Sequence, residues 1–169
     1  MLAYVLAGAA LVAAVALVFA GRAGCFANKS LGDLEPATVL HVSDGDTLYV
    51  RLASGEEGFV RLIGVDAPES VNPDETLNTP EGEAAAAFVR SLVQPGQTVW
   101  LAHDVTDHDQ YGRWLRYVWL EVPDDVLSAD EVRTKMLQGI LVSAGHAQVK
   151  GYAPDTSYDA LFRKLASSV

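Results

Sequence analysis

The 169-residue chain has one cysteine, Cys25, and only 12 basic residues against 22 acidic ones. A single cysteine cannot form an internal disulfide and offers no cysteine-based zinc site, so a hydrophobic core must stabilise the fold. The shortage of lysine and arginine gives a formal net charge of −10, which argues against nucleic-acid binding through a broadly basic surface. The 50% apolar content excludes a disordered chain, and the length suits one domain plus a short segment.

The N-terminus is hydrophobic, because residues 2–20 carry no charged side chain and Arg22 is the first charge. About 20 apolar residues are enough for a helix to cross a bilayer. The basic start and shorter apolar stretch of a signal peptide are missing, which favours an uncleaved anchor over a cleaved signal. Ala23-Gly24-Cys25 is similar to a lipoprotein acylation site, but Arg22 stands where that pattern has an aliphatic residue. The predicted division is a transmembrane anchor or uncleaved signal segment at 1–21, a linker at 22–36, and a folded domain at 37–169.

Short apolar segments separated by glycine-containing turns predict five strands, at 37–42, 47–52, 58–65, 98–101 and 115–120. Capping signals predict helices from Thr79 to Val93, from Ser128 to near Gly145, and from Tyr158 to Leu165. The strands are mostly consecutive, and helices follow the third and the fifth. This order fits an α+β fold with a small closed five-stranded barrel and about three helices better than a parallel sheet.

Three separated motifs carry residues suited to chemistry on phosphate: Asp44-Gly-Asp46, Arg61-Leu-Ile-Gly-Val-Asp-Ala-Pro-Glu69, and Tyr111-Gly-Arg113. Each motif alone is ordinary turn or strand sequence. Together they combine hard oxygen ligands with guanidinium groups that match phosphate geometry. The four acids of these motifs contribute −4 and the two arginines reduce this to −2, which one divalent cation would neutralise. The set therefore predicts a metal ion and a phosphate at one site.

The motifs and their order resemble those of the staphylococcal nuclease (thermonuclease) family. The matching segments are Asp44-Gly-Asp-Thr47, Arg61 to Glu69, and Asp109-Gln-Tyr-Gly-Arg113. The resemblance covers about Ala37 to Leu165 and implies an OB-fold barrel, in agreement with the strand count. It further implies a calcium-dependent nuclease that hydrolyses phosphodiester bonds of DNA and RNA. In this family a metal-associated water attacks in line and 3′-phosphate ends remain.

The resemblance also implies a role for each matching residue. The Ca²⁺ ligands would be Asp46, Asp66 and the backbone carbonyl of Ala67. Arg61 and Arg113 would hold the scissile phosphate, and Glu69 would position or deprotonate the attacking water. The expected supporting residues around the metal ligands are Asp44 and Thr47. Tyr111 and Tyr152 are expected to contact substrate, with packing at the barrel edge as the alternative for both.

A rival interpretation is a catalytically silent OB-fold module that binds nucleic acid or protein at the cell envelope. Such a module needs neither metal carboxylates nor Glu69, so the retention of all five acids and arginines favours the enzyme. We expect a monomer that acts on DNA and RNA, preferably single-stranded, and that is membrane-anchored through residues 1–21 or secreted. The acidic charge predicts weak capture of long nucleic acid away from the site, without excluding the function.

Overall fold

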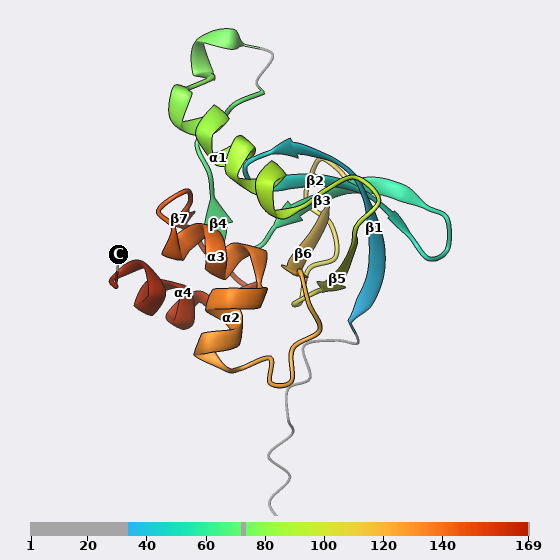
Figure 1. Cartoon of the computed structure of the whole chain (residues 1–169), viewed down its shortest axis with the longest axis vertical. Coiled ribbons are helices and arrows are strands. Elements are labelled where there is room, and N and C mark those ends of the chain that lie inside the picture. The colour runs from blue at the N-terminus through green and yellow to red at the C-terminus, as the bar shows by residue number, and fades with distance from the viewer. Residues whose placement is uncertain (1–33, 72–73, 169) are drawn as a thin grey trace, which may run out of the picture. The chain divides into compact units, whose positions relative to one another are not determined.

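The computed structural model describes residues 34–71 and 74–168, and their central feature is a closed barrel (Figure 1). The strand order is β1-β2-β3-β6-β5, with β5 closing on β1. The strands are β1 (Glu35–Asp44), β2 (Thr47–Leu52), β3 (Glu57–Leu62), β5 (Thr98–Ala102) and β6 (Trp114–Trp119). The five-stranded barrel predicted from the sequence is confirmed.

The predicted anchor at residues 1–21 and the possible lipidation site Cys25 lie outside the described residues. Within the described part, no helix combines the length and the apolar character that crossing a membrane requires.

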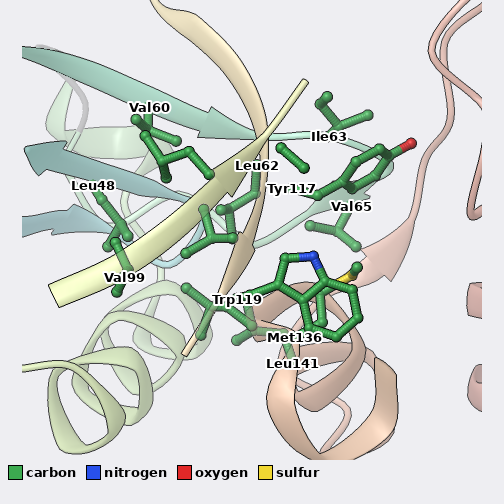
Figure 2. Packing of buried hydrophobic residues seen from close by; sticks show 14 of the residues in the cluster. Leu48, Val60, Leu62, Ile63, Val65, Val99, Tyr117, Trp119, Met136 and Leu141 are labelled. Carbon is green, nitrogen blue, oxygen red and sulfur yellow. The ribbon is translucent and has the colours of Figure 1, made fainter. Parts of the chain in front are cut away.

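Alternating side chains of the barrel strands build the core. Leu48, Val50 and Val60 are fully buried inside the barrel, while the residues between them face outward, as the two-residue period of a strand requires. The core continues between β6 and the helices, where Trp119 packs near Met136 and Leu141 (Figure 2). All barrel pairs are antiparallel except β3 with β6, which run parallel.

Helix α1 (Pro80–Leu92) packs on β1, and its start is fixed by local capping. The Thr79 hydroxyl accepts the Gly82 N–H at 3.0 Å, and proline occupies the first helical position, where its missing N–H costs nothing. A short 3₁₀ turn, η1 (Glu75–Leu77), precedes this cap. The predicted helix from Thr79 to Val93 is therefore confirmed.

The remaining helices are α2 (Ala129–Lys135), α3 (Leu137–Ser143) and α4 (Asp159–Ala166), which gather beside the barrel (Figure 1). One continuous helix from Ser128 to near Gly145 was the expectation, and this is wrong. Met136 is extended, with φ −92° and ψ 127°, and forms an isolated bridge with Trp119. Its fully buried side chain and this bridge to β6 outweigh the continuous helical pattern.

The predicted third strand at 58–65 is also divided. β3 ends at Leu62, and Gly64 has φ +79°, a conformation that glycine adopts without a steric penalty. The chain then forms β4 (Val65–Asp66), which pairs with β7 (Gln148–Val149) in a separate two-stranded sheet. This turn out of the barrel directs Asp66 and the residues after it toward the end of β1.

Candidate active site

Asp46 lies in the turn between β1 and β2 and is only 7% exposed. One carboxylate oxygen accepts the Ala67 N–H at 3.0 Å, and the other accepts the Thr47 hydroxyl at 3.0 Å. Burial raises the pKa of Asp46, although Arg61 and these hydrogen bonds oppose the effect. A Cβ at Gly45 would lie 2.8 Å from the Ala67 Cβ and 2.9 Å from that of Ala85, so only glycine lets this turn pack so closely.

Arg61, on β3, joins the first two motifs through its guanidinium group. One terminal nitrogen lies 2.9 Å from Asp46 Oδ2 and 2.9 Å from Asp66 Oδ1. The other donates to the carbonyls of Leu62 and Val65, both at 2.9 Å. The arginine side chain is 15% exposed. Arg61 therefore fixes the two candidate metal carboxylates beside each other in the described structure.

Glu69 is positioned by the start of α1. Its carbonyl accepts the Thr79 N–H at 2.9 Å, and it lies so close to Gly82 that any Cβ there would collide with it. The exposed Glu69 carboxyl group faces Asp44 and Asp46. Partial burial, a hydrogen bond with Asp44 and the negative charges of both aspartates raise the pKa of Glu69. This carboxyl group is therefore a stronger base than an ordinary glutamate.

Asp44 is held in turn by its own neighbours. The Ser70 hydroxyl donates to Asp44 Oδ1 at 2.6 Å, and the Gly45 N–H donates to the same oxygen at 2.7 Å. The first motif and the residue that directly follows the second thus fix the carboxylate that contacts Glu69.

Arg113 lies in the loop before β6, where Asp109 orients it. Its Nε donates to Asp109 Oδ2 at 2.7 Å, and the backbone N–H groups of Arg113 and Tyr111 donate to Asp109 Oδ1. The guanidinium carbon lies 5.5 Å from the centre of the Tyr111 ring, a cation–π arrangement. The aspartate that precedes the Tyr-Gly-Arg motif therefore has a positioning role, which the sequence analysis did not assign to it.

Two pockets meet at Arg113. A pocket of about 420 Å³ is lined by both Arg61 and Arg113 and by the two candidate substrate tyrosines, Tyr111 and Tyr152. A second, of about 210 Å³, is lined by Arg113 together with Asp44, Thr47, Glu69 and Phe59. The structure thus brings all the predicted site residues into one connected region. Both tyrosines are exposed, at 76% and 64%, which disfavours the alternative of packing at the barrel edge.

Lys150 is a site residue that the sequence analysis missed. Its ammonium group lies 2.7 Å from Asp66 Oδ2 and 5.8 Å from the centre of the Tyr152 ring, and it lines the larger pocket. Asp66 is therefore paired with two cations, one on each carboxylate oxygen. Because the two residues are 84 positions apart, no local sequence signal indicated this contact.

The donors fit a hard divalent cation. Asp46 Oδ2 and Asp66 Oδ1 each lie 2.9 Å from one nitrogen, so they are at most twice that distance apart. One calcium ion, with ligand distances of about 2.4 Å, can bring two such oxygens together. The raised pKa values of Asp46 and Glu69 mark a site that favours added positive charge. Within the described ranges, no three acidic, histidine or cysteine side chains gather as a metal cluster.

A barrel that brings carboxylates and two arginines to adjoining pockets has the groups that a nuclease, a hydrolase of phosphodiester bonds, requires. A family model described as "Staphylococcal nuclease homologue" matches residues 59–168, more than half of the chain. The chain belongs to this family.

Characterised relatives agree with this assignment. A thermonuclease of Staphylococcus intermedius is 37% identical over 130 residues, which cover 77% of this chain and 68% of that protein. A thermonuclease of Staphylococcus hyicus is 32% identical over 146 residues, covering 85% and 78%. Endonuclease YncB of Bacillus subtilis is 33% identical over 144 residues, covering 84% and 61%. The predicted family and the enzyme class are confirmed, whereas the silent binding module is not supported.

Proposed function

We propose that the chain is a calcium-dependent nuclease that cleaves DNA and RNA, preferably single-stranded, and leaves 3′-phosphate ends. One observation carries the proposal: a single nitrogen of Arg61 lies 2.9 Å from both Asp46 and Asp66, and Arg61 lines a pocket with Arg113, which lines a second pocket with Glu69. A protein that only binds nucleic acid has no need for a buried carboxylate, Asp46, beside a second one, Asp66. Their retention supports hydrolysis.

Asp46, Asp66 and the Ala67 carbonyl would hold the ion, and bound calcium would supply Lewis-acid polarisation of a phosphoryl oxygen. Arg61 and Arg113 flank the larger pocket and would hold the phosphate from two sides. Their planar guanidinium groups donate paired hydrogen bonds, which strengthen as charge grows on the phosphate oxygens. A phosphate has to share or replace the present contacts of Arg61 with the two aspartates.

Glu69 would accept the proton of the attacking water. Its raised pKa suits a base, because this carboxylate binds a proton more strongly than an ordinary glutamate does. The water oxygen forms a new bond to phosphorus while the bond from phosphorus to the 5′ oxygen breaks. The phosphate stays on the 3′ side, and the 5′ oxygen leaves as a hydroxyl after taking a proton from solvent.

The breadth of substrate follows from the groups that line the site. Tyr111 and Tyr152 can stack on any base, and the arginines contact phosphate, which is identical in every nucleotide. No base-reading donor set is needed for these contacts. This supports action on both DNA and RNA, with single strands favoured because their bases are free to stack.

The test is cleavage of a labelled single-stranded oligonucleotide with calcium and with a chelator. We expect cleavage only with calcium, and products that a phosphatase must treat before a terminal transferase can extend them. A Glu69→Gln variant that folds and binds calcium should lose several orders of magnitude in cleavage rate. A control variant, Lys164→Gln, changes an exposed residue and should cleave at the parent rate. Full cleavage in chelator, or directly extendable products, would contradict the proposal.

We further propose that residues 1–21 anchor the nuclease at the cell envelope, that a linker joins them to the barrel, and that the barrel with its helices is the catalytic domain, which acts as a monomer. The uncharged run at residues 2–20 supports the anchor. Cell fractionation should place the 169-residue chain with membranes and a chain beginning at residue 34 in the soluble fraction. Light scattering of the shorter chain should give the mass of one copy.

A further inference from the structure

Three aromatic side chains lie side by side on the outer face of the barrel. His41 on β1, Tyr49 on β2 and Phe59 on β3 occupy directly paired positions of adjacent strands. The ring centres of His41 and Tyr49 are 5.0 Å apart, and those of Tyr49 and Phe59 are 4.8 Å apart. We call these three residues the aromatic stripe.

The stripe is outside the barrel core. The neighbours of Tyr49 in sequence, Leu48 and Val50, are fully buried, and so is Val60 beside Phe59. By strand alternation, the aromatic rings point away from that core. His41 is exposed, Tyr49 is half-buried, and Phe59 is 42% exposed. Aromatic cross-strand pairs stabilise sheets, but that role alone does not require the rings to adjoin a site.

The stripe is continuous with the candidate active site. Phe59 lines the smaller pocket together with Glu69 and Arg113. Along the two antiparallel strands, the pair Tyr49 and Phe59 lies two residues from the pair Thr47 and Arg61, which belongs to the site. Two residues of a strand span about 7 Å, about the axial rise of two stacked nucleotides. A strand of nucleic acid that leaves the site on this side therefore passes over the rings.

The negative net charge of the protein favours base stacking over phosphate contacts as the way the stripe binds nucleic acid. The chain carries −10 overall, so a broad attraction for phosphates is absent. The charged residues next to the stripe neutralise each other, because Arg51 and Glu57 form an ion pair at 2.7 Å. Aromatic faces bind bases of any sequence without basic residues. The bases of a single strand can stack on these rings, whereas the bases of a duplex are already stacked on one another.

We propose that the aromatic stripe binds single-stranded nucleic acid by stacking the bases that adjoin the phosphate being cleaved. The inference rests on the proposed nuclease function and adds to it a second binding region for longer substrates. The stripe raises affinity for oligonucleotides over single nucleotides and contributes to the preference for single strands. Its contribution depends little on salt, because it involves no ion pairs with phosphate.

The kinetic test compares two substrates with calcium: the p-nitrophenyl ester of thymidine 5′-phosphate, which cannot reach the stripe, and a 12-nucleotide oligothymidylate. Tyr49→Thr and His41→Ser, at two stripe positions that line neither pocket of the candidate active site, should lower kcat/KM for the oligonucleotide by about 5- to 100-fold, mainly through KM. The small ester should be cut at the parent rate. Tyr49→Phe, which keeps the aromatic ring, should retain the parent activity on both. His146→Ser, which breaks a separate stacked pair with Phe88, should change neither.

A binding test separates failure of the stripe from failure of the nuclease. Fluorescence anisotropy of the same labelled oligonucleotide is measured in chelator, where the protein does not need to cut. Weaker binding by Phe59→Leu and Tyr49→Thr, by a factor that is the same at low and high salt, supports the stripe even if no cleavage occurs. Equal binding by parent and variants, or equal kinetic losses on both substrates, would overturn it. Thermal unfolding of each variant confirms that it is folded.

Discussion

Removal of Arg61 should destabilise the metal-free protein strongly, because Asp46 is buried and depends on this arginine for its opposite charge. The relevant side chains are 15% and 10% exposed, and their closest atoms are 2.9 Å apart. Removing one partner of a buried ion pair costs about 3 to 5 kcal/mol. The contact with Asp66 adds less than about 1 kcal/mol, since that carboxylate is 38% exposed. We therefore expect Arg61→Met to lose about 3 to 6 kcal/mol of unfolding free energy.

The assay is urea unfolding in chelator at neutral pH, followed by circular dichroism. The expected loss corresponds to a fall in Tm of about 10 °C or more for a domain of this size. In a double-mutant cycle, Asp46→Asn should remove most of the penalty of Arg61→Met, because no buried charge then lacks a partner. Saturating calcium should also restore stability, since a cation can replace the guanidinium group between the carboxylates.

The pH dependence of this variant follows from the direction of the pKa shift. Burial already holds the pKa of Asp46 above 3.8 with Arg61 present, and loss of Arg61 raises it further. A carboxyl group whose pKa is higher in the folded than in the unfolded state destabilises the fold when the group is ionised. The free-energy penalty of Arg61→Met should therefore shrink as the pH falls through the raised pKa of Asp46. A loss below about 1 kcal/mol at neutral pH, or one that Asp46→Asn leaves unchanged, would refute the reasoning.

Three other perturbations have definite expected results. Lys150→Met should tighten calcium binding, because the ammonium group 2.7 Å from Asp66 competes with the ion. Titration calorimetry measures the affinity, and an unchanged affinity would mean that opening this ion pair has no free-energy cost. In the metal-free protein the pKa of Glu69 should lie above that of an ordinary glutamate, as measured by NMR titration of its carboxyl carbon; a pKa at or below the ordinary value would contradict the contact with Asp44 and Asp46 that makes it a stronger base. Gly82→Ala should lower kcat at least tenfold while α1 persists, because the added Cβ displaces the Glu69 carbonyl; parent activity in a folded variant would show that this contact does not position Glu69.

The barrel could be predicted from the sequence because its signals are local. Each strand has its own alternation and turn residues, and Thr79 and Ser128 have side chains that cap the following helices as expected. The two errors, at Gly64 and Met136, arise where long-range pairing overrides the local pattern. Val65 pairs with Val149, and Met136 forms a bridge with Trp119, so the deciding partners are distant in the chain.

The candidate site was predictable as a set of residue types but not as a network. Motif order identified the acids and arginines that the structure brings together. The contact of Lys150 with Asp66 and the packing of Gly82 against the Glu69 backbone depend on tertiary structure alone. The aromatic stripe was missed for the same reason, because its three members belong to different strands and become neighbours only through register.

The most direct test of the central claim is hydrolysis of a single-stranded oligonucleotide by the purified chain, with its Glu69→Gln and Arg113→Ala variants beside it. We predict rapid cleavage in calcium, none in chelator, and a loss of about 3 to 4 kcal/mol of transition-state stabilisation for each folded variant. Undiminished cleavage by either variant, or cleavage that does not depend on calcium, would contradict the account.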